Sequence, residues 1–173
     1  MITIIDYDAG NIKSVEKALP YLGQEVCVTR KAQEILAADK VILPGVGSFG
    51  NSMEKLKEYG LVDVIRQVCK RGTPFLGICL GLQLLFEESE ESPGIKGLGI
   101  LPGKILRIPK APGLKIPHMG WNSLYFPREA RLFQGVSQGS YVYFVHSYYL
   151  QAADKTIVTA ATDYGVSIHA SVE

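Results

Sequence analysis

The sequence predicts an α/β protein with a mostly parallel central sheet flanked by helices and a β-rich C-terminal half. In the first half, short apolar runs of strand length alternate with segments of helical periodicity, as repeated βα units do. Glycine-rich loops follow two of these runs, at 44–50 and 77–81. Such loops fall at the carboxyl ends of parallel strands, where functional groups gather. Beyond residue 91, closely spaced prolines and glycines argue against long helices and favour short strands.

The first half is expected to contain four strands with helices between them. The apolar runs predict strands at 2–5, 25–29, 40–43 and 74–78. Periodicity predicts helices at 11–19, 51–59, 61–70 and 80–88, with one or two further turns at 33–38. Asn11 is a suitable N-cap for the first helix, and Pro20 is expected to end or bend it. In the second half we expect strands near 99–101, 104–108, 141–149, 156–162 and 166–172.

Composition narrows the class of protein. The chain has 173 residues, enough for one domain with a sizeable core, and its net charge of +1 does not favour nucleic acid or a membrane surface as a partner. Three scattered cysteines favour neither a disulfide framework nor a zinc site and suit a reducing cytoplasm. Neither a signal peptide nor a membrane-spanning run is expected.

A cysteine between two glycines ends the fourth expected strand. Residues 77–81 read Gly-Ile-Cys-Leu-Gly, so Cys79 falls where a strand turns sharply into a helix. This is the nucleophile-elbow pattern with sulfur in place of oxygen, and it predicts a strained backbone conformation at the cysteine. Free N–H groups and the positive end of the following helix would favour the reactive thiolate. A buried core cysteine is the alternative, and the motif alone leaves both open.

A second glycine-rich loop, Pro-Gly-Val-Gly-Ser-Phe-Gly at 44–50, follows the third strand. It lacks the lysine and the spacing of phosphate-binding and dinucleotide-binding motifs. Its backbone N–H groups can instead face a developing negative charge. The natural oxyanion donors are the N–H groups of Gly47 and of Leu80, the residue after the cysteine. A flexible turn is the alternative for this loop.

Three histidines are candidates for the general base that a cysteine nucleophile needs. His118 lies in a Pro-His-Met-Gly-Trp-Asn cluster that is more typical of a binding surface. His146 lies in a strand-like run that places Tyr148 on the same face, and a buried structural histidine is the alternative there. His169 lies close to Glu173 in the last expected strand, where we do not expect the base.

Five segments together resemble one known family. Residues 77–86 resemble the nucleophile segment of class I, triad-type glutamine amidotransferases. Residues 6–15 resemble one branch of them, the glutaminase subunits of imidazole glycerol phosphate synthase in histidine biosynthesis. Further segments of that branch match at 44–49, 117–122 and 143–148, in the same order. The resemblance spans the chain and implies a flavodoxin-like class I glutamine amidotransferase fold, with residues 1–173 in a single domain.

The resemblance implies a role for each matching residue. Cys79 would attack the side-chain amide of L-glutamine and form a thioester. Gly47 and Leu80 would supply the oxyanion hole. The orientation of the peptide near Val46 would be under the control of a partner. Glu91 would pair with the α-ammonium group of glutamine. The glutamine-binding set would comprise Gln83, Glu91, His146, Ser147 and Tyr148.

The resemblance also implies a partner. Ammonia would pass to a (β/α)8 cyclase subunit in a heterodimer, which would make imidazole glycerol phosphate and an aminoimidazole carboxamide ribonucleotide. The residues facing it would be Asn11, Ser14, His118, Met119, Trp121 and Asn122. Neither a cofactor nor a metal is implied.

The sequence departs from the family's pattern at one point. The family's catalytic base and its orienting acid lie in a His-Pro-Glu segment downstream of the last expected strand, and neither His169 nor Glu173 has that spacing. We therefore expect the full-length gene to continue into such a segment. The alternative is a catalytically incomplete subunit that still docks on the synthase. Another type of cysteine hydrolase is disfavoured because it gives no reason for residues 6–15.

Overall fold

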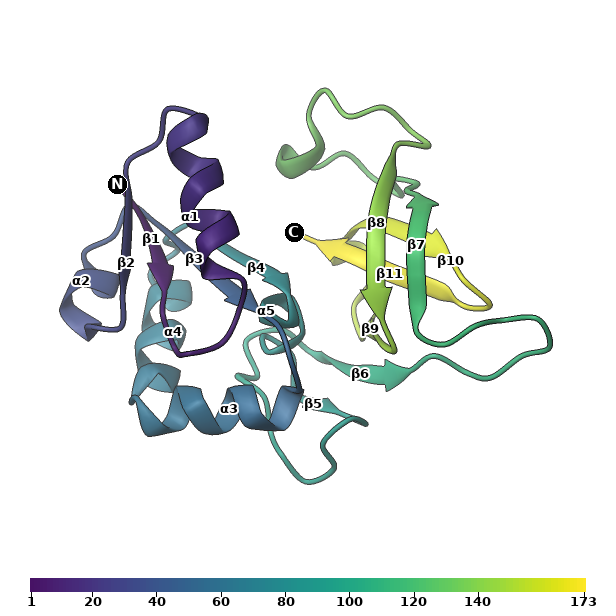
Figure 1. Ribbon diagram of the computed structural model, residues 1–173, viewed down its shortest axis with the longest axis horizontal. Coiled ribbons are helices and arrows are strands. Elements are labelled where there is room, and N and C mark those ends of the chain that lie inside the picture. The colour runs from purple at the N-terminus through teal and green to yellow at the C-terminus, as the bar shows by residue number, and fades with distance from the viewer. The chain divides into compact units, whose positions relative to one another are not determined.

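The computed structural model describes all 173 residues (Figure 1). The chain forms two compact units, residues Met1–Leu101 (unit 1) and Pro102–Glu173 (unit 2). Helices longer than one turn occur in unit 1, whereas unit 2 consists of strands, loops and two short 3-10 helices.

Unit 1 is built on a four-stranded parallel sheet with the strand order β2-β1-β3-β4. Its strands are β1 (Ile2–Ile5), β2 (Val26–Thr29), β3 (Lys40–Gly45) and β4 (Phe75–Cys79). Its helices are α1 (Ile12–Tyr21), α2 (Ala32–Leu36), α3 (Phe49–Glu58), α4 (Leu61–Lys70) and α5 (Leu80–Gln83), followed by the two-residue β5 (Glu88–Ser89). The predicted α/β class with a parallel sheet and flanking helices is confirmed.

The core of unit 1 follows from its sequence pattern. The central strands β1 and β3 are buried on both faces, because helices cover a parallel sheet from both sides. In α4, the buried residues recur at helical spacing: Leu61, Val64, Ile65 and Val68.

Glycines allow β3 and the turn after β4 to approach closely. A Cβ atom on Gly81 would lie 1.9 Å from the carbonyl oxygen of Leu43, and one on Gly45 would lie 2.6 Å from the backbone nitrogen of Gly81. A Cβ atom on Gly77 would lie 2.7 Å from the carbonyl oxygen of Gly81. A side chain at Gly45 or Gly81 would push the end of β3 away from the cysteine turn, and one at Gly77 would push the start of α5 away from β4.

Unit 2 consists of antiparallel strand pairs. The pairs are β6 (Gly103–Arg107) with β9 (Tyr148–Ala152), β7 (His118–Ser123) with β8 (Tyr141–His146), and β10 (Val158–Asp163) with β11 (Ser167–Val172). The 3-10 helices are η1 (Arg131–Phe133) and η2 (Lys155–Ile157). The β-rich second half is therefore confirmed.

The segment after Cys79 differs from the prediction. Helix α5 ends at Gln83 rather than near residue 88, because the chain folds back on its end: Leu98 N–H donates to the carbonyl of Leu84. Residues 99–101 form no strand, since the N–H groups of Ile100 and Leu101 donate to the carbonyl of Leu85.

In α1, Asn11 makes no side-chain capping bond and Pro20 lies inside the last turn.

The strand prediction for 141–149 is wrong in one respect. That segment is two strands with different partners, and Ser147 separates them, its carbonyl accepting a hydrogen bond from Ile108 N–H. Strand β7 was not predicted at all.

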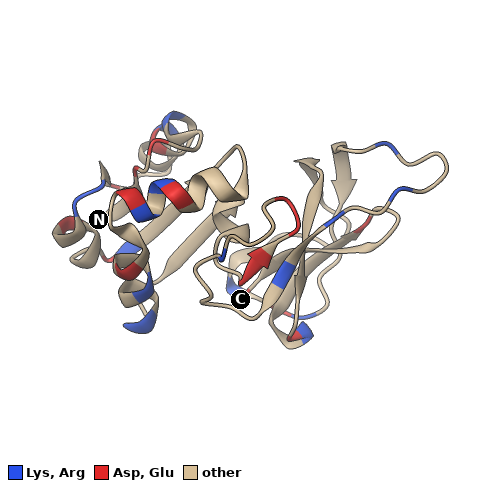
Figure 2. Cartoon of the chain, turned by 90° about the horizontal axis from the view of Figure 1, so that it is seen from below, with Lys and Arg blue, Asp and Glu red and all other residues tan.

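Charges of both signs are interspersed along the helices of unit 1 (Figure 2). No helix combines the length and apolar character needed to cross a bilayer.

Candidate active site at Cys79

Cys79 occupies a strained backbone position at the junction of β4 and α5. Its φ is 56° and its ψ is −115°, and Asp8 is the only other non-glycine residue with positive φ. Non-glycine residues held in such conformations cluster at functional sites, because the surrounding fold has to maintain the strain. The side chain is exposed, so the alternative of a buried core cysteine is excluded.

The pKa of the Cys79 thiol is raised, and the expected preference for thiolate is wrong for this site. Partial desolvation by the surrounding chain raises the pKa, and a hydrogen bond from the backbone N–H of Leu80 lowers it by less. The expectation relied on a helix dipole. Helix α5 has only four residues, too few aligned peptide groups to outweigh the desolvation. Attack at neutral pH therefore requires a base.

The loop after β3 begins beside Cys79. Gly45 and Cys79 are partners in the parallel register of β3 and β4, so residues 46–48 continue from that point. Gly47 has φ +94°, which favours glycine, and open space surrounds the position of a Cβ atom. Helix α3 starts directly afterwards at Phe49. The backbone groups of Gly47 and Leu80, the predicted oxyanion donors, thus belong to two segments that the sheet register brings together.

The far end of this loop is held by side chains from residues 91 and 92. Glu91 Oε2 accepts a hydrogen bond from Phe49 N–H at 2.8 Å, and Ser92 Oγ accepts one from Gly50 N–H at 2.9 Å. These are the first two N–H groups of α3, which have no partner within the helix. One oxygen of Glu91 therefore has a structural role. Its predicted contact with glutamine stays a prediction, as does that of the half-buried Gln83.

Tyr7 is a residue near the site that the sequence reasoning missed. Its side chain is completely buried, and its hydroxyl donates to the carbonyl of Pro44 at 2.8 Å. Burial raises the pKa of this hydroxyl to about 12, a hydrogen bond with Ser52 opposes the rise, and the charge of Cys79 adds to it. The available signal was a tyrosine between two aspartates directly after the first strand.

In unit 2, two of the candidate histidines form a hydrogen-bonded chain. His118 Nδ1 lies 2.9 Å from His146 Nε2, and His146 Nδ1 lies 3.0 Å from the carbonyl oxygen of Tyr148. Asn122 Nδ2 lies 3.5 Å from His118 Nε2. These contacts are all satisfied when both rings are neutral, with a proton on each Nδ1. Desolvation lowers the pKa of His118 to about 4 and also lowers that of His146.

His118 does not fit the predicted partner surface. It is only 3% exposed, and its ring stacks between Phe144 and Tyr164, with ring centroids at 4.6 Å and 3.7 Å. The strand alternation of β7 turns it inward. His169 is also engaged, because its Nδ1 accepts a hydrogen bond from Ala152 N–H.

The opposite face of the β7–β8 pair is apolar and exposed. Met119 pairs with Val145 and Trp121 with Tyr143, and Tyr141 continues the same face beside Ser123. The exposed fractions of Met119 and Trp121 are 61% and 68%. We call Met119, Trp121, Tyr141, Tyr143 and Val145 the β7–β8 face. In unit 1, Asn11 and Ser14 are also exposed, at the start of α1.

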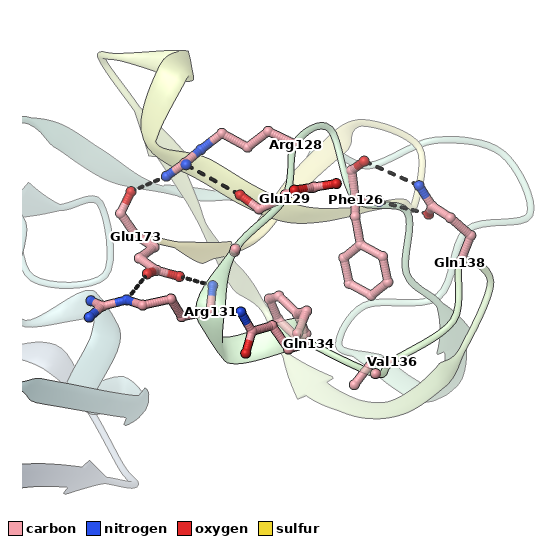
Figure 3. Close-up of a pocket in the computed structure, with 11 residues that line it drawn as sticks. Phe126, Arg128, Glu129, Arg131, Gln134, Val136, Gln138 and Glu173 are labelled. Carbon is pink, nitrogen blue, oxygen red and sulfur yellow. Dashed lines mark hydrogen bonds and ion pairs between the residues drawn. The ribbon is translucent and has the colours of Figure 1, made fainter.

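A pocket of about 920 Å³ lies in unit 2 among residues 126–138 and Glu173 (Figure 3). The Glu173 carboxylate accepts hydrogen bonds from Arg131 Nε at 2.7 Å and Arg131 N–H at 2.9 Å, and Arg128 donates to the Glu173 carbonyl. The side-chain amide of Gln138 accepts a hydrogen bond from the N–H of Phe126 and donates one to the carbonyl of Phe126. Arg131 and Glu173 therefore pair with each other, Arg128 bonds backbone carbonyls, and no nucleophile lines the pocket.

Comparison with known proteins shows the family of the chain. Residues 3–173 match the family model described as glutamine amidotransferase class-I. The chain is 52% identical over 172 residues to imidazole glycerol phosphate synthase subunit HisH from Moorella thermoacetica, covering 99% of the chain and 81% of that protein. It is 55% identical to a protein of the same name from Bacillus cereus, covering 97% of the chain and 79% of that protein.

Solved structures show the same fold. A crystal structure titled glutamine amidotransferase superposes with a TM-score of 0.71 at 20% identity, covering 95% of this chain and 86% of the other. The structure of PurLQS from Thermotoga maritima gives 0.68 at 20% identity, covering 93% of this chain and 73% of the other. Since the family match extends over nearly every residue and includes the strained cysteine turn, the chain belongs to the class-I glutamine amidotransferase family.

Proposed function

We propose that this chain is the glutaminase subunit of an imidazole glycerol phosphate synthase, acting in histidine biosynthesis in the cytoplasm as a single amidotransferase domain. Relatives with that subunit name are about half identical to it along nearly its whole length. The observation that carries the proposal is the exposed thiol of Cys79, held at positive φ beside the glycine loop that starts at its register partner Gly45.

The proposed reaction begins with attack of the Cys79 sulfur on the side-chain carbonyl carbon of L-glutamine. The C–S bond forms, and the carbonyl oxygen takes up negative charge that the N–H groups of Leu80 and Gly47 stabilise. Collapse of this intermediate breaks the C–N bond, and the thiol proton goes to the leaving nitrogen to give ammonia. Water then hydrolyses the thioester to glutamate and the free thiol.

A general base has to move these protons, and we do not assign that role to a histidine of unit 2. Each of its three histidines makes hydrogen bonds inside unit 2. The family resemblance implies that the base and its acid come from a His-Pro-Glu segment, and we propose that full activity depends on it. Glutamine would be held by Gln83, Glu91, His146, Ser147 and Tyr148.

The second candidate function is a binding or assembly subunit that docks on the synthase without hydrolysing glutamine. The raised pKa of Cys79 favours it, because a thiol without a base is a poor nucleophile at neutral pH. Both candidates share the proposed (β/α)8 cyclase partner in a heterodimer. The β7–β8 face supports such a contact, because exposed Trp and Tyr side chains are typical interface anchors. Asn11, Ser14 and Asn122 are proposed to extend the contact.

Ammonia release from glutamine distinguishes the two candidates. Wild type and Cys79→Ala are assayed with and without the cyclase subunit, and complex formation is measured in parallel. Partner-stimulated release that Cys79→Ala abolishes supports the glutaminase. Complex formation without any release supports the assembly subunit. Neither release nor complex formation overturns both.

A further inference from the structure

We propose that Tyr7 is a positioning residue for the oxyanion site, because its buried hydroxyl bonds the Pro44 carbonyl at the start of the loop that carries Gly47. The inference rests on the proposed glutaminase function. It assigns Tyr7 a role in the rate of the reaction, although Tyr7 itself is buried below the loop and is not placed in contact with glutamine.

The Tyr7 hydroxyl holds the start of the loop. It donates to the carbonyl of Pro44, the residue before Gly45, at 2.8 Å. The side chain of Ser52, in the first turns of α3 after the loop, acts on the same hydroxyl and lowers its pKa. Ser52 is only 2% exposed, so the surroundings of the hydroxyl on this side are buried as well. The end of β3 is therefore bonded to a hydroxyl group that lies inside the core of unit 1.

The contact at Pro44 extends the sheet where its backbone ladder stops. Strand β1 pairs with β3 only as far as Ile4 opposite Ile42, whereas the pairing of β3 with β4 continues to Gly45. Beyond Ile42, the Tyr7 hydroxyl takes the place of a backbone donor from β1. Without it, the Pro44 carbonyl would be a buried acceptor with no partner, which a protein interior disfavours.

Tyr7 is itself fixed by its two neighbours. Arg30 Nη2 lies 2.8 Å from Asp6 Oδ2 and 2.6 Å from Asp8 Oδ1, so one guanidinium group joins the residues before and after Tyr7. Asp8 has φ 60° and also accepts a hydrogen bond from the Tyr59 hydroxyl. The pairing with Arg30 and Tyr59 keeps the pKa of Asp8 low, so this carboxylate stays charged.

The next turn packs directly on the loop. A Cβ atom on Gly10, at φ +107°, would lie 3.3 Å from the Pro44 side chain and 3.4 Å from Gly45 N. The segment from Tyr7 to Gly10 thus supports the Pro44–Gly45 peptide both by a hydrogen bond and by contact. A preorganised donor is what oxyanion stabilisation requires, since a donor that must reorganise during the reaction stabilises the transition state less.

The test compares Tyr7→Phe with wild type in the complex with the cyclase partner. We expect kcat for ammonia release to fall about 10-fold while KM for glutamine stays within about 2-fold, because the oxyanion exists only after attack. The second readout is the dissociation constant of glutamate γ-semialdehyde. The Cys79 S–H bond adds across its C=O group, forming a C–S bond and placing the proton on the former carbonyl oxygen. This adduct fills the oxyanion site, and Tyr7→Phe should weaken it by a factor similar to the loss in kcat.

Controls separate positioning from folding. Tyr164→Phe removes a bond of the same type outside the loop, from an exposed tyrosine hydroxyl to the carbonyl oxygen of Lys115 at 2.7 Å, and should change neither readout. Alkylation of Cys79 by iodoacetamide, which needs no oxyanion donor, should proceed equally in wild type and Tyr7→Phe. If Tyr7→Phe does not fold, Ser52→Ala removes a buried side chain that acts on the same hydroxyl and should shift kcat and aldehyde affinity in the same direction.

The outcomes are distinguishable. The role of Tyr7 is overturned if Tyr7→Phe keeps the wild-type kcat and the wild-type affinity for the aldehyde. It is also overturned if kcat and the alkylation rate change by the same factor. Both outcomes leave the glutaminase proposal intact. A wild-type complex that neither releases ammonia nor binds the aldehyde overturns the glutaminase proposal and this inference with it.

Discussion

Gly45 and Cys79 form the last pair of the parallel ladder between β3 and β4. The glycine loop and the cysteine turn therefore leave the sheet at the same level. Their distance depends on the register of two buried strands, and the glycines at 45, 77 and 81 set how closely the segments approach. The geometry of the candidate site therefore depends on the sheet. Substitutions of the glycines at these close backbone contacts should lower the free energy of unfolding by predictable amounts.

Gly81→Ala is expected to be more destabilising than Gly47→Ala. A Cβ atom at position 81 would lie 1.9 Å from the Leu43 carbonyl oxygen, so β3 or the turn has to move, at a cost of roughly 3 kcal/mol. At position 47 there is open space, and only the positive φ opposes alanine, at about 1–2 kcal/mol. Urea unfolding of the two variants measures the difference. Equal costs would contradict the close approach at Leu43.

The alkylation rate of Cys79 is expected to rise with pH along a curve whose midpoint lies above the usual thiol range. Its raised pKa means that less thiolate is present at neutral pH than in a free cysteine. Iodoacetamide labelling of the isolated chain, followed by peptide mass spectrometry, separates Cys79 from Cys27 and Cys69. A midpoint below the usual range would show that the resting site stabilises thiolate.

Unit 2 is expected to lose stability as the pH falls from about 6.5 to 4. The folded-state pKa of His118 is about 4, below its ordinary value, so between these pH values the unfolded chain binds the extra proton. Stability is therefore fully present above about 6.5 and declines on acidification, by about 3 kcal/mol in total. The fluorescence of Trp121, the single tryptophan, follows unfolding of this unit. His118→Gln should flatten the slope, and an unchanged slope would assign it to other groups.

Trp121→Ala is expected to weaken binding of the cyclase partner about 30-fold, as loss of a central aromatic anchor does. The indole is 68% exposed in this chain, so its emission should shift to shorter wavelength when a partner covers it. Leu132→Ala provides the control, because Leu132 is 55% exposed but lies on η1, outside the β7–β8 face. Equal effects of the two substitutions would argue against this face as the contact.

Local sequence signals were sufficient to predict an element where a single buried pattern runs between clear start and stop residues. Strand β1 and helix α4 begin and end at the predicted residues, because each has one buried pattern with clear stops. Cys79 could be located because two glycines flank it at a strand end. The strained backbone that the elbow pattern predicts for Cys79 is confirmed by its positive φ. Its raised pKa could not be predicted, because it depends on how far the folded chain removes the thiol from water.

Long-range partners were the main source of error. Strand β7 was missed because its outward residues, Met119 and Trp121, are apolar, while the inward His118 is polar, which reverses the usual alternation. Tyr7 and Glu91 bond residues 37 and 42 positions away, and no local pattern indicates such contacts. The split between β8 and β9 at Ser147 likewise depends on β6 and β7 as separate partners.

The side-chain caps on Phe49 and Gly50 have a consequence for motion. Pro44 is hydrogen-bonded at one end and the first turn of α3 at the other, so residues 46–48 form a short linker whose two ends are both held by hydrogen bonds. A single peptide unit in such a linker can rotate by opposite changes in the two torsion angles that flank it, while its neighbours stay in place. The backbone freedom of Gly47 lowers the cost of that rotation. The direction of one N–H group can therefore change without any movement of the sheet.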